Sequence, residues 1–257
     1  MPVEYADFIS KVKQKLGIDL SLYKEAQMKR RLTSLRDKRG FHSFQAYFLG
    51  LENNPILMNE FIDRLTINVS EFYRNPKRWE VLKNDILPAI VKQHTSISIW
   101  SAACSTGEEP YSIAMLMREH FPQVSFRIIA TDLDEGVLEK AKQGIYREQA
   151  LKELPEAWKK KYFNEKNGLY TIDPALKKEI VFKRHNLLAD TYPSQQHIII
   201  CRNVLIYFTE QAKKSIYQHF SQALVDEGVL FVGSTEQIFH PETYRFKLTE
   251  TFFYQKK

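Results

Sequence analysis

Residues 99–112 read Ile-Trp-Ser-Ala-Ala-Cys-Ser-Thr-Gly-Glu-Glu-Pro-Tyr-Ser, and this stretch decides the fold class. Its apolar start predicts a buried strand, the small residues predict a tight turn, and Pro110 is followed by apolar residues at helical spacing. A strand that ends in such a turn at a helix start is how α/β folds bring backbone amides close to a ligand. The acidic pair Glu108–Glu109 disfavours a phosphate and suits a ligand that carries hydroxyls and a positive charge.

Residues 126–134 predict a second strand, which ends in two acids. In an open parallel sheet the ligand lies at the carboxyl ends of the strands, and an acid there commonly accepts hydrogen bonds from ribose hydroxyls. Either acid could instead cap the helix expected at 135–143. The spacing favours Asp134 as the helix cap and Asp132 as the ribose acceptor.

Two more strands follow further along the chain. Residues 197–201 form an apolar run typical of a central parallel strand, and the polar residues just after it are expected to face the ligand crevice. A helix that Thr209 caps leads to a strand at 228–234. Strands and helices therefore alternate from about residue 96, which predicts an α/β domain.

The N-terminal part, residues 1–70, is expected to be all-helical, and a linker helix at about 77–93 joins it to the sheet. One N-terminal helix is strongly basic: seven basic and only two acidic residues lie between Ser21 and Gly40. Met28, Leu32 and Leu35 give this helix an apolar face, so its charges lie on the outside. A solvated surface or a nucleic-acid interface would each explain such a helix, the latter because the chain has a pI near 9.1.

The alternation of strands and helices breaks between Gly144 and Asn186. Asn167-Gly168 is a strong turn dipeptide between two short runs of strand-forming residues. Short strands are also expected around Asp173-Pro174 and at 180–182, so the sequence predicts a small antiparallel insert at about 148–183.

Composition sets the remaining limits. A chain of 257 residues holds one α/β domain and a small accessory unit. No apolar run approaches the roughly 20 residues that span a bilayer, and no secretory signal is visible. Cys104 and Cys201 are expected to be a reduced cytosolic pair, and no His or Cys spacing indicates a metal site. Nothing demands more than a monomer.

Taken together, these motifs resemble the CheR family of chemotaxis receptor methyltransferases. The resemblance covers residue 60 to the end of the chain, and its segments occur in the family's order: 68–75, 100–112, 130–134, 186–188, 201–208 and 233–236. It implies a Rossmann-like S-adenosylmethionine (SAM) domain at 71–257 with a helical N-terminal domain and an antiparallel β-subdomain. It also implies transfer of a methyl group from SAM to receptor glutamates, in the cytoplasm, with recruitment to receptor clusters at the inner membrane face. Some members of the family bind a receptor tail peptide on the β-subdomain, but no feature of this insert commits it to that role.

The resemblance also implies roles for particular residues. Arg74 would bind either the cofactor's methionine carboxylate or the substrate glutamate, and Tyr207 would hydrogen-bond the reacting carboxylate or pack on the sulfonium. The basic helix would lie against the receptor's acidic methylation region through Arg30, Arg31, Arg36 and Arg39, and nucleic acid is not expected as a partner. The cofactor would contact Asn68, Ser70, Arg74, Glu108, Asp132, Asn186, Leu187, Asn203 and Val204. Glu108 would bind the cofactor's ammonium, and the family more often has Thr where Ser70 stands.

The chemistry agrees with the absence of an obvious catalytic dyad. A glutamate side chain has a reference pKa of about 4.3, so the nucleophile is already ionised at neutral pH and needs no general base. Holding the carboxylate in line with the methyl group and excluding water is then the main task. Two alternatives stay open: a SAM-dependent RNA methyltransferase, and a non-catalytic module that only binds SAM.

Overall fold

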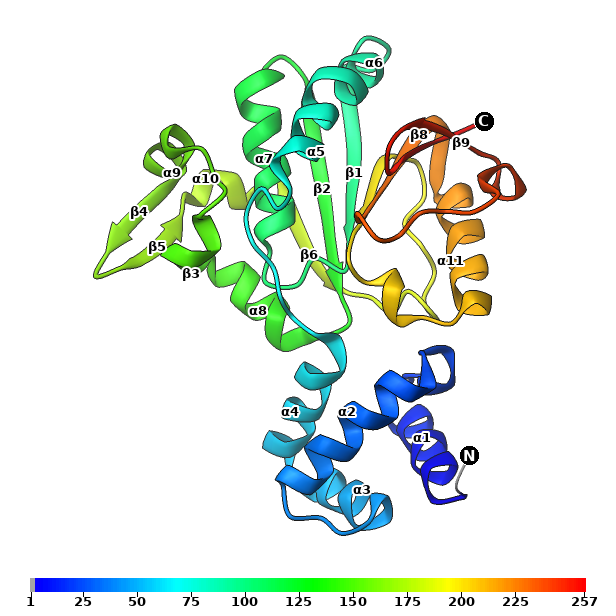
Figure 1. The fold of residues 1–257 in the computed structure, drawn as a ribbon. Coiled ribbons are helices and arrows are strands. Elements are labelled where there is room, and N and C mark those ends of the chain that lie inside the picture. Colours follow the sequence, from blue (N-terminus) through cyan, green and yellow to red (C-terminus); the bar gives the residue numbers. More distant parts are fainter. Residues whose placement is uncertain (1–2) are drawn as a thin grey trace.

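In the computed structural model, which describes residues 3–257, five parallel strands form the centre of the larger domain (Figure 1). The order of the seven-stranded sheet is β6-β2-β1-β7-β8-β10-β9, and β10 and β9 run antiparallel to their neighbours. The chain therefore reverses its direction of winding between β1 and β7, which is where α/β sheets bind ligands. The bounds are β1 Ser96–Ala102, β2 Ser125–Asp132, β6 Ile180–Arg184, β7 Gln196–Cys201, β8 Leu224–Val232, β9 Phe246–Glu250 and β10 Phe253–Lys256.

Helices cover both faces of this sheet. Alternate residues of β7 belong to different cores: Ile198 and Ile200 pack towards one side and Ile199 towards the other. The first side is covered by α7 (Glu108–His120) and by the helical run α5–η2–α6, and the second by α11 (Glu210–Ala223). Burial on both faces explains why the strand at 196–201 reads as a continuous apolar run.

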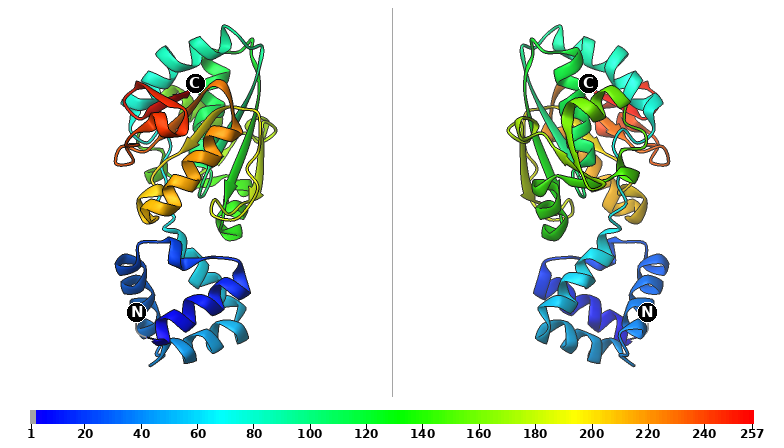
Figure 2. Two further views of the ribbon diagram at one scale, coloured as in Figure 1. Left: turned by 90° about the vertical axis from the view of Figure 1, so that its right-hand side faces the viewer. Right: turned by 90° about the vertical axis from the view of Figure 1, so that its left-hand side faces the viewer.

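The N-terminal helices form a smaller unit beyond one end of the sheet (Figure 2). Large apolar side chains fill its core, among them Phe8, Leu32, Tyr47 and Phe61. The expected helices are confirmed, and so is the buried apolar face of the basic helix α2. The elements are α1 Val3–Leu16, η1 Leu20–Leu22, α2 Glu25–Lys38, α3 Phe44–Asn53 and α4 Pro55–Thr66.

The linker helix is also confirmed, with one irregularity. It consists of α5 (Pro76–Val81), the π-helical turn η2 (Leu82–Ile86) and α6 (Leu87–Val91). Trp79, Leu82 and Leu87 are buried against the sheet, so this run belongs to the larger domain.

The insert is antiparallel as expected, but its bounds differ. Its sheet has the order β3-β5-β4, with β3 Ile145–Arg147, β4 Phe163–Lys166 and β5 Leu169–Ile172. Asn167 (φ 54°) and Gly168 (φ 72°) form the predicted hairpin turn. The short elements η3 (Glu148–Leu151) and α9 (Glu156–Tyr162) lie between β3 and β4.

Two predictions about the end of the insert are wrong. Asp173 and Pro174 start a helix, α10 (Pro174–Lys177), because the Asp173 side chain accepts a hydrogen bond from the Ala175 amide. Residues 180–182 lie in β6, which pairs in parallel with β2 at the edge of the main sheet. The strands of the insert therefore fall within 145–172 rather than 148–183. A short apolar run predicts a strand but does not determine which sheet the strand joins.

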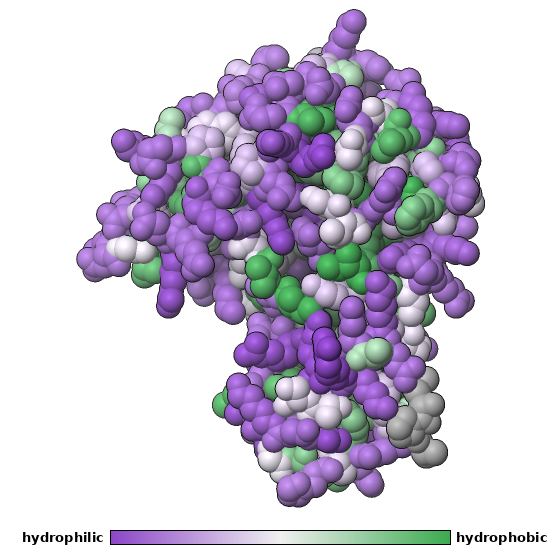
Figure 3. Space-filling model, viewed as in Figure 1, coloured by the Kyte–Doolittle hydropathy of each residue, from purple (hydrophilic) through white to green (hydrophobic). Residues whose placement is uncertain are grey.

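The two domains meet at the carboxyl ends of the parallel strands. The Lys24 amide donates to the Tyr207 carbonyl and the Thr209 amide donates to the Leu22 carbonyl, both at 2.9 Å. Asn68 Nδ2 lies 3.1 Å from Asp134 Oδ2. The space-filling view shows hydrophobic side chains gathered near this junction on an otherwise largely hydrophilic face (Figure 3).

Candidate active site

Two adjoining cavities lie at the reversal point of the sheet, and they share Thr66, Ala103, Asp132 and Val204. One is largely apolar and the other is polar and charged. A ligand with an apolar ring at one end and charged groups at the other would match this division. The apolar cavity is further lined by Tyr23, Leu65, Leu133, His185, Asn186, Leu187, Tyr207 and Phe208. The polar cavity is further lined by Ile67, Asn68, Val69, Ser70, Glu71, Arg74, Trp79, Cys104, Ser105, Glu109, Arg202 and Asn203.

The turn after β1 forms the floor between them. Ala103 (φ 67°), Ser105 (φ 50°) and Gly107 (φ 94°) all adopt left-handed backbone conformations. A side chain at Gly107 would place a Cβ only 2.9 Å from the Cβ of Ala141, so glycine is required there. Helix α7 begins directly afterwards, at Glu108. It therefore includes Pro110, whereas the sequence predicts that the helix follows this proline.

Asp132 ends β2 between the two cavities and is almost fully buried. Its carboxylate accepts hydrogen bonds from the amides of Ser105 (2.9 Å) and Asp134 (3.1 Å). Burial outweighs these bonds and raises the pKa of Asp132 to about 6. Asp134 caps α8 (Glu135–Gln143) through the Gly136 amide at 2.7 Å, as the spacing predicted.

The two acids of the Gly-Glu-Glu motif have different surroundings, and only Glu109 is among the residues that line the polar cavity, whereas Glu108 was the acid predicted to bind the ammonium. Glu108 is not among the lining residues of either cavity; its buried carboxylate accepts from the Thr106 hydroxyl and also lies beside Ser70. Glu109 lines the polar cavity, where Oε1 accepts from Ser101 Oγ at 2.8 Å and Oε2 lies 3.8 Å from Arg202 Nη1. Burial raises the pKa of Glu109 above its usual value, and the nearby Arg202 guanidinium offsets this only in part.

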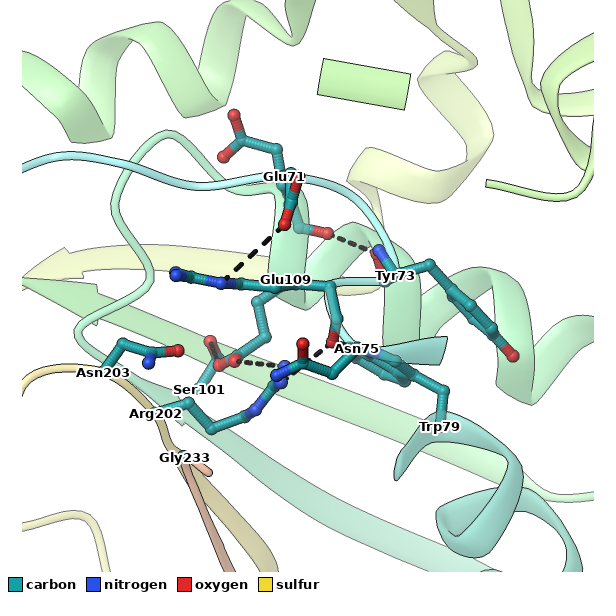
Figure 4. A network of polar contacts seen from close by, with 12 residues as sticks. Glu71, Tyr73, Asn75, Trp79, Ser101, Glu109, Arg202, Asn203 and Gly233 are labelled. Atoms are coloured by element: carbon teal, nitrogen blue, oxygen red, sulfur yellow. Dashed lines mark hydrogen bonds and ion pairs between the residues drawn. The ribbon is translucent and has the colours of Figure 1, made fainter. Parts of the chain in front are cut away.

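The segment between the domains forms the lip of the polar cavity. Arg74 is one-third exposed, and its Nε lies 3.8 Å from Glu71, which also pairs with Lys152 at 3.0 Å. Asn68 donates hydrogen bonds from its side-chain amide to Asp134 and Thr66, and both Asn68 and Ser70 line the cavity. Figure 4 shows this segment, with Glu71 and Tyr73, next to the residues of the cavity floor.

The loop after β7 completes the wall. Asn203 has φ 62°, and its amide donates to Glu236 at 2.7 Å; the same carboxylate accepts from Gly233 at 2.8 Å. Glu236 thereby ties the ends of β7 and β8 together. Asn186 uses its side chain structurally, because Oδ1 accepts from the Leu188 amide and Nδ2 donates to the Gly17 carbonyl.

Tyr207 connects the apolar cavity to a basic groove on the helical domain. The groove is lined by Gln27, Arg30, Arg31, Ser34, Leu35, Lys38, Arg64 and Tyr207. The Arg31 guanidinium lies 5.5 Å from the Tyr207 ring centroid and donates to the Leu65 carbonyl.

Only two of the four predicted substrate arginines therefore line this groove, Arg30 and Arg31. Arg36 pairs with Asp37 and stacks on Phe44, and Arg39 forms a two-bond pair with Glu60.

Several residues of the site were not predicted from the sequence. Glu109 stood beside the residue that was chosen, and Arg202 and Glu236 stood inside or next to recognised motifs. Tyr23, Leu65 and Thr66 of the helical domain carried no signal, because their place in the cavity depends on how the two domains pack.

Within residues 3–257, no group of three or more His, Cys, Asp or Glu side chains is placed to hold a metal ion. No helix in the same range combines the length and the apolar character needed to cross a bilayer. Cys104 and Cys201 are both free and buried.

Comparison with known proteins identifies the family. The family model "CheR methyltransferase, all-alpha domain" matches residues 3–66, and "CheR methyltransferase, SAM binding domain" matches residues 68–253. The chain is 43% identical over 254 residues to a chemotaxis protein methyltransferase of Listeria monocytogenes, covering 98% of this chain and 97% of that protein. It is 36% identical to a chemotaxis protein methyltransferase of Borreliella burgdorferi, covering 91% and 88%. It is 34% identical to chemotaxis protein methyltransferase 2 of Vibrio cholerae, covering 90% and 86%. With both parts of the family matched along nearly its whole length, the chain belongs to the CheR family of SAM-dependent methyltransferases.

Proposed function

We propose that this protein transfers a methyl group from SAM to the side-chain carboxylates of glutamates on chemoreceptors, and so acts in chemotaxis adaptation. The relatives named above support the chemotaxis role, since each is called a chemotaxis protein methyltransferase. The observation that carries the proposal is the position of Tyr207, which lines both a cavity suited to SAM and a basic groove suited to an acidic protein surface.

The residues of the two cavities fit SAM. Adenine would lie in the apolar cavity against Leu187 and Val204, and Asp132 would accept hydrogen bonds from the ribose hydroxyls. The ammonium of the methionine part would pair with Glu109. Two residues that line the polar cavity, Ser105 and Arg202, each have one buried polar atom (Oγ and Nε) with no hydrogen-bond partner in the described part of the chain, which is consistent with a site that takes a polar ligand.

The basic groove would receive the acidic helical region of the receptor. Arg30, Arg31, Lys38 and Arg64 line it, and no acidic residue does. Such a surface attracts an acidic partner at long range and sets its orientation. Tyr207 would then lie beside the glutamate that enters from the groove.

Arg74 would position the reacting carboxylate at the mouth of the polar cavity. Its present partner, Glu71, is 3.8 Å away, a loose contact that a substrate carboxylate can replace with a two-bond pair. SAM supplies an activated methyl group, and the chain contributes orientation and exclusion of water rather than a base, since the glutamate is already ionised.

The test uses methyl-labelled SAM with chemoreceptor cytoplasmic fragments and bulk RNA as parallel acceptors. We expect base-labile label on the receptor, and a fall of about 100-fold or more in kcat/KM for Arg74→Ala, because this variant loses a contact to the reacting group. Arg39→Ala is the control, since Arg39 is paired with Glu60 outside both cavities. Label on RNA, or bound SAM with no label on either acceptor, would contradict the proposal.

A further inference from the structure

Arg202 lines the polar cavity and is the only buried arginine among the residues that the structure describes (Figure 4). It follows β7 directly, and its side chain is only 3% exposed. Four groups surround the guanidinium, one of them the Trp79 ring, whose centroid lies 5.9 Å away. Nη2 donates to the Arg74 carbonyl at 2.8 Å, Nη1 lies 3.8 Å from Glu109 Oε2, and the Phe231 ring centroid lies 4.7 Å away.

We propose that Arg202 is a positioning residue that acts on both ends of the reaction: it keeps Glu109 charged for the cofactor's ammonium and holds the backbone of Arg74 for the incoming carboxylate. The inference rests on the proposed function, because the ligands of Glu109 and Arg74 are those assigned above.

The effect on Glu109 is electrostatic. Its carboxylate is buried, so loss of solvation favours the neutral form, in which it would no longer attract an ammonium. Arg202 and, more weakly, Arg74 oppose this, the Ser101 hydroxyl donates a hydrogen bond, and Glu236 adds an unfavourable like charge. Arg202 is therefore the main cation that opposes the protonation of Glu109.

The effect on Arg74 is geometric. Its neighbours Tyr73 (φ 56°) and Asn75 (φ 61°) both have left-handed conformations, which cost energy and persist only where surrounding contacts impose them. The Arg74 carbonyl between them accepts two hydrogen bonds, from Arg202 Nη2 and from Trp79 Nε1 at 3.0 Å. Arg202 thus fastens the lip segment to the end of β7.

Lysine would not replace Arg202 in both roles. The two contacts use separate nitrogens of one planar group, Nη1 towards the carboxylate and Nη2 towards the carbonyl, whereas an ammonium is a single point of charge. A lysine would preserve the charge near Glu109 and lose the fixed geometry at Arg74. The two functions can therefore be separated by experiment.

The experiment measures binding of two ligands to the full-length protein by calorimetry between pH 5.5 and 8.5. S-adenosylhomocysteine carries the amino-acid end that Glu109 would bind, and 5′-methylthioadenosine lacks it but keeps the adenine and ribose. For Arg202→Met we expect the affinity for S-adenosylhomocysteine to fall by a factor of about ten or more. The pH below which this affinity declines should rise by about one pH unit or more relative to wild type. Methylthioadenosine should bind within about twofold of wild type. For Arg202→Lys we expect near-normal binding of S-adenosylhomocysteine but a reduced kcat for methyl transfer.

Arg118→Met is the matched control, because Arg118 also joins a carboxylate (Glu179) to a backbone carbonyl (Ala175), but on the far end of α7. An equal loss of both ligands in Arg202→Met, or an unchanged pH profile for S-adenosylhomocysteine, would overturn the inference and leave Arg202 a merely structural residue. Failure of the proposed function is distinguishable, since it would show as absent receptor methylation in the wild-type protein.

Discussion

At the scale of single residues, the site concentrates unusual backbone conformations. Ala103, Ser105 and Asn203 line the polar cavity and have positive φ angles, as do Tyr73 and Asn75 on either side of the lining residue Arg74. None is glycine, so each costs free energy, of the order of 1–3 kcal/mol, that the rest of the fold must offset. The sequence showed small residues at 102–107 and predicted a tight turn, but nothing in it predicted the strain at Asn203.

The buried position of Asp132 predicts a pH effect on nucleoside binding. Its pKa is raised to about 6 by burial, so the carboxylate becomes protonated as the pH falls through that value. If the ionised form accepts the ribose hydroxyls, 5′-methylthioadenosine should bind progressively more weakly below pH about 6. Asp132→Asn should bind it about tenfold more weakly at pH 8 and show little pH dependence. Calorimetric titration from pH 5 to 8 measures both, and a wild-type affinity that stays constant over this range would contradict the assignment.

The raised pKa also has a consequence for stability. A carboxyl group that binds its proton more tightly in the folded state than in the unfolded state destabilises the fold. The loss of stability grows as the pH rises above about 4, the usual pKa of Asp, and is complete above pH about 6. Asp132→Asn is therefore expected to keep or raise the melting temperature of the ligand-free protein at neutral pH. A lower melting temperature would show that the hydrogen bonds from Ser105 and Asp134 outweigh the burial of the charge.

Substitution of Glu108 and of Glu109, the two acids of the Gly-Glu-Glu motif, gives a sharper test of the proposed cofactor site. Glu109→Gln removes the charge that faces the polar cavity, so affinity for S-adenosylhomocysteine should fall about 10- to 100-fold. Glu108→Gln changes a residue that is turned onto Thr106 and should alter that affinity by less than about threefold. Calorimetric titration at pH 7.5 compares the two variants. A larger loss of affinity in Glu108→Gln than in Glu109→Gln would show that Glu108, and not Glu109, binds the ammonium.

At the scale of elements, the basic residues of α2 fall into two groups with different contacts. Arg36 and Arg39 pair with acids of their own domain, whereas Arg30 and Lys38 are exposed and line the groove beside Tyr207. The double variant Arg30→Ala/Lys38→Ala should raise KM for the receptor about tenfold, with more effect at low salt, and leave KM for SAM unchanged. Arg31 is left intact because it also packs on Tyr207. The control Arg36→Ala/Arg39→Ala removes as many charges, and an equal rise in receptor KM would show that only total charge matters.

Individual helices, strands and turns are also the features that were best predicted from the sequence. The strand at 196–201, the helix at 135–143 and the Asn167-Gly168 turn were all predictable, because each depends on a local pattern of burial, capping or turn chemistry. The strand at 180–184 was recognised but assigned to the wrong sheet, since pairing with β2 is decided by the path of the chain and not by the residues of the strand. Arg202 was missed for a similar reason: its partners, Arg74 and Glu109, are distant in sequence and meet only in the folded protein.

At the scale of the whole molecule, residues of both domains line the apolar cavity in which we propose that SAM binds. Tyr23, Leu65 and Thr66 of the helical domain line it together with Leu187 and Val204 of the sheet domain. A ligand that contacts both domains at once stabilises the arrangement in which they are packed together. SAM binding is therefore expected to order the domain junction as well as the pocket itself.

Hydrogen exchange measures this coupling directly. On addition of S-adenosylhomocysteine, we expect slower exchange at Leu22–Lys24, whose Lys24 amide donates to the Tyr207 carbonyl, and at the turn 103–107. Peptides from the core of α3, such as 46–52, should not change, because they lie inside the helical domain and away from the cavity. Protection confined to the sheet domain would show that the ligand binds without the helical domain. The groove on α2 would then bind its substrate independently of the cofactor, and Tyr207 would no longer join the two sites.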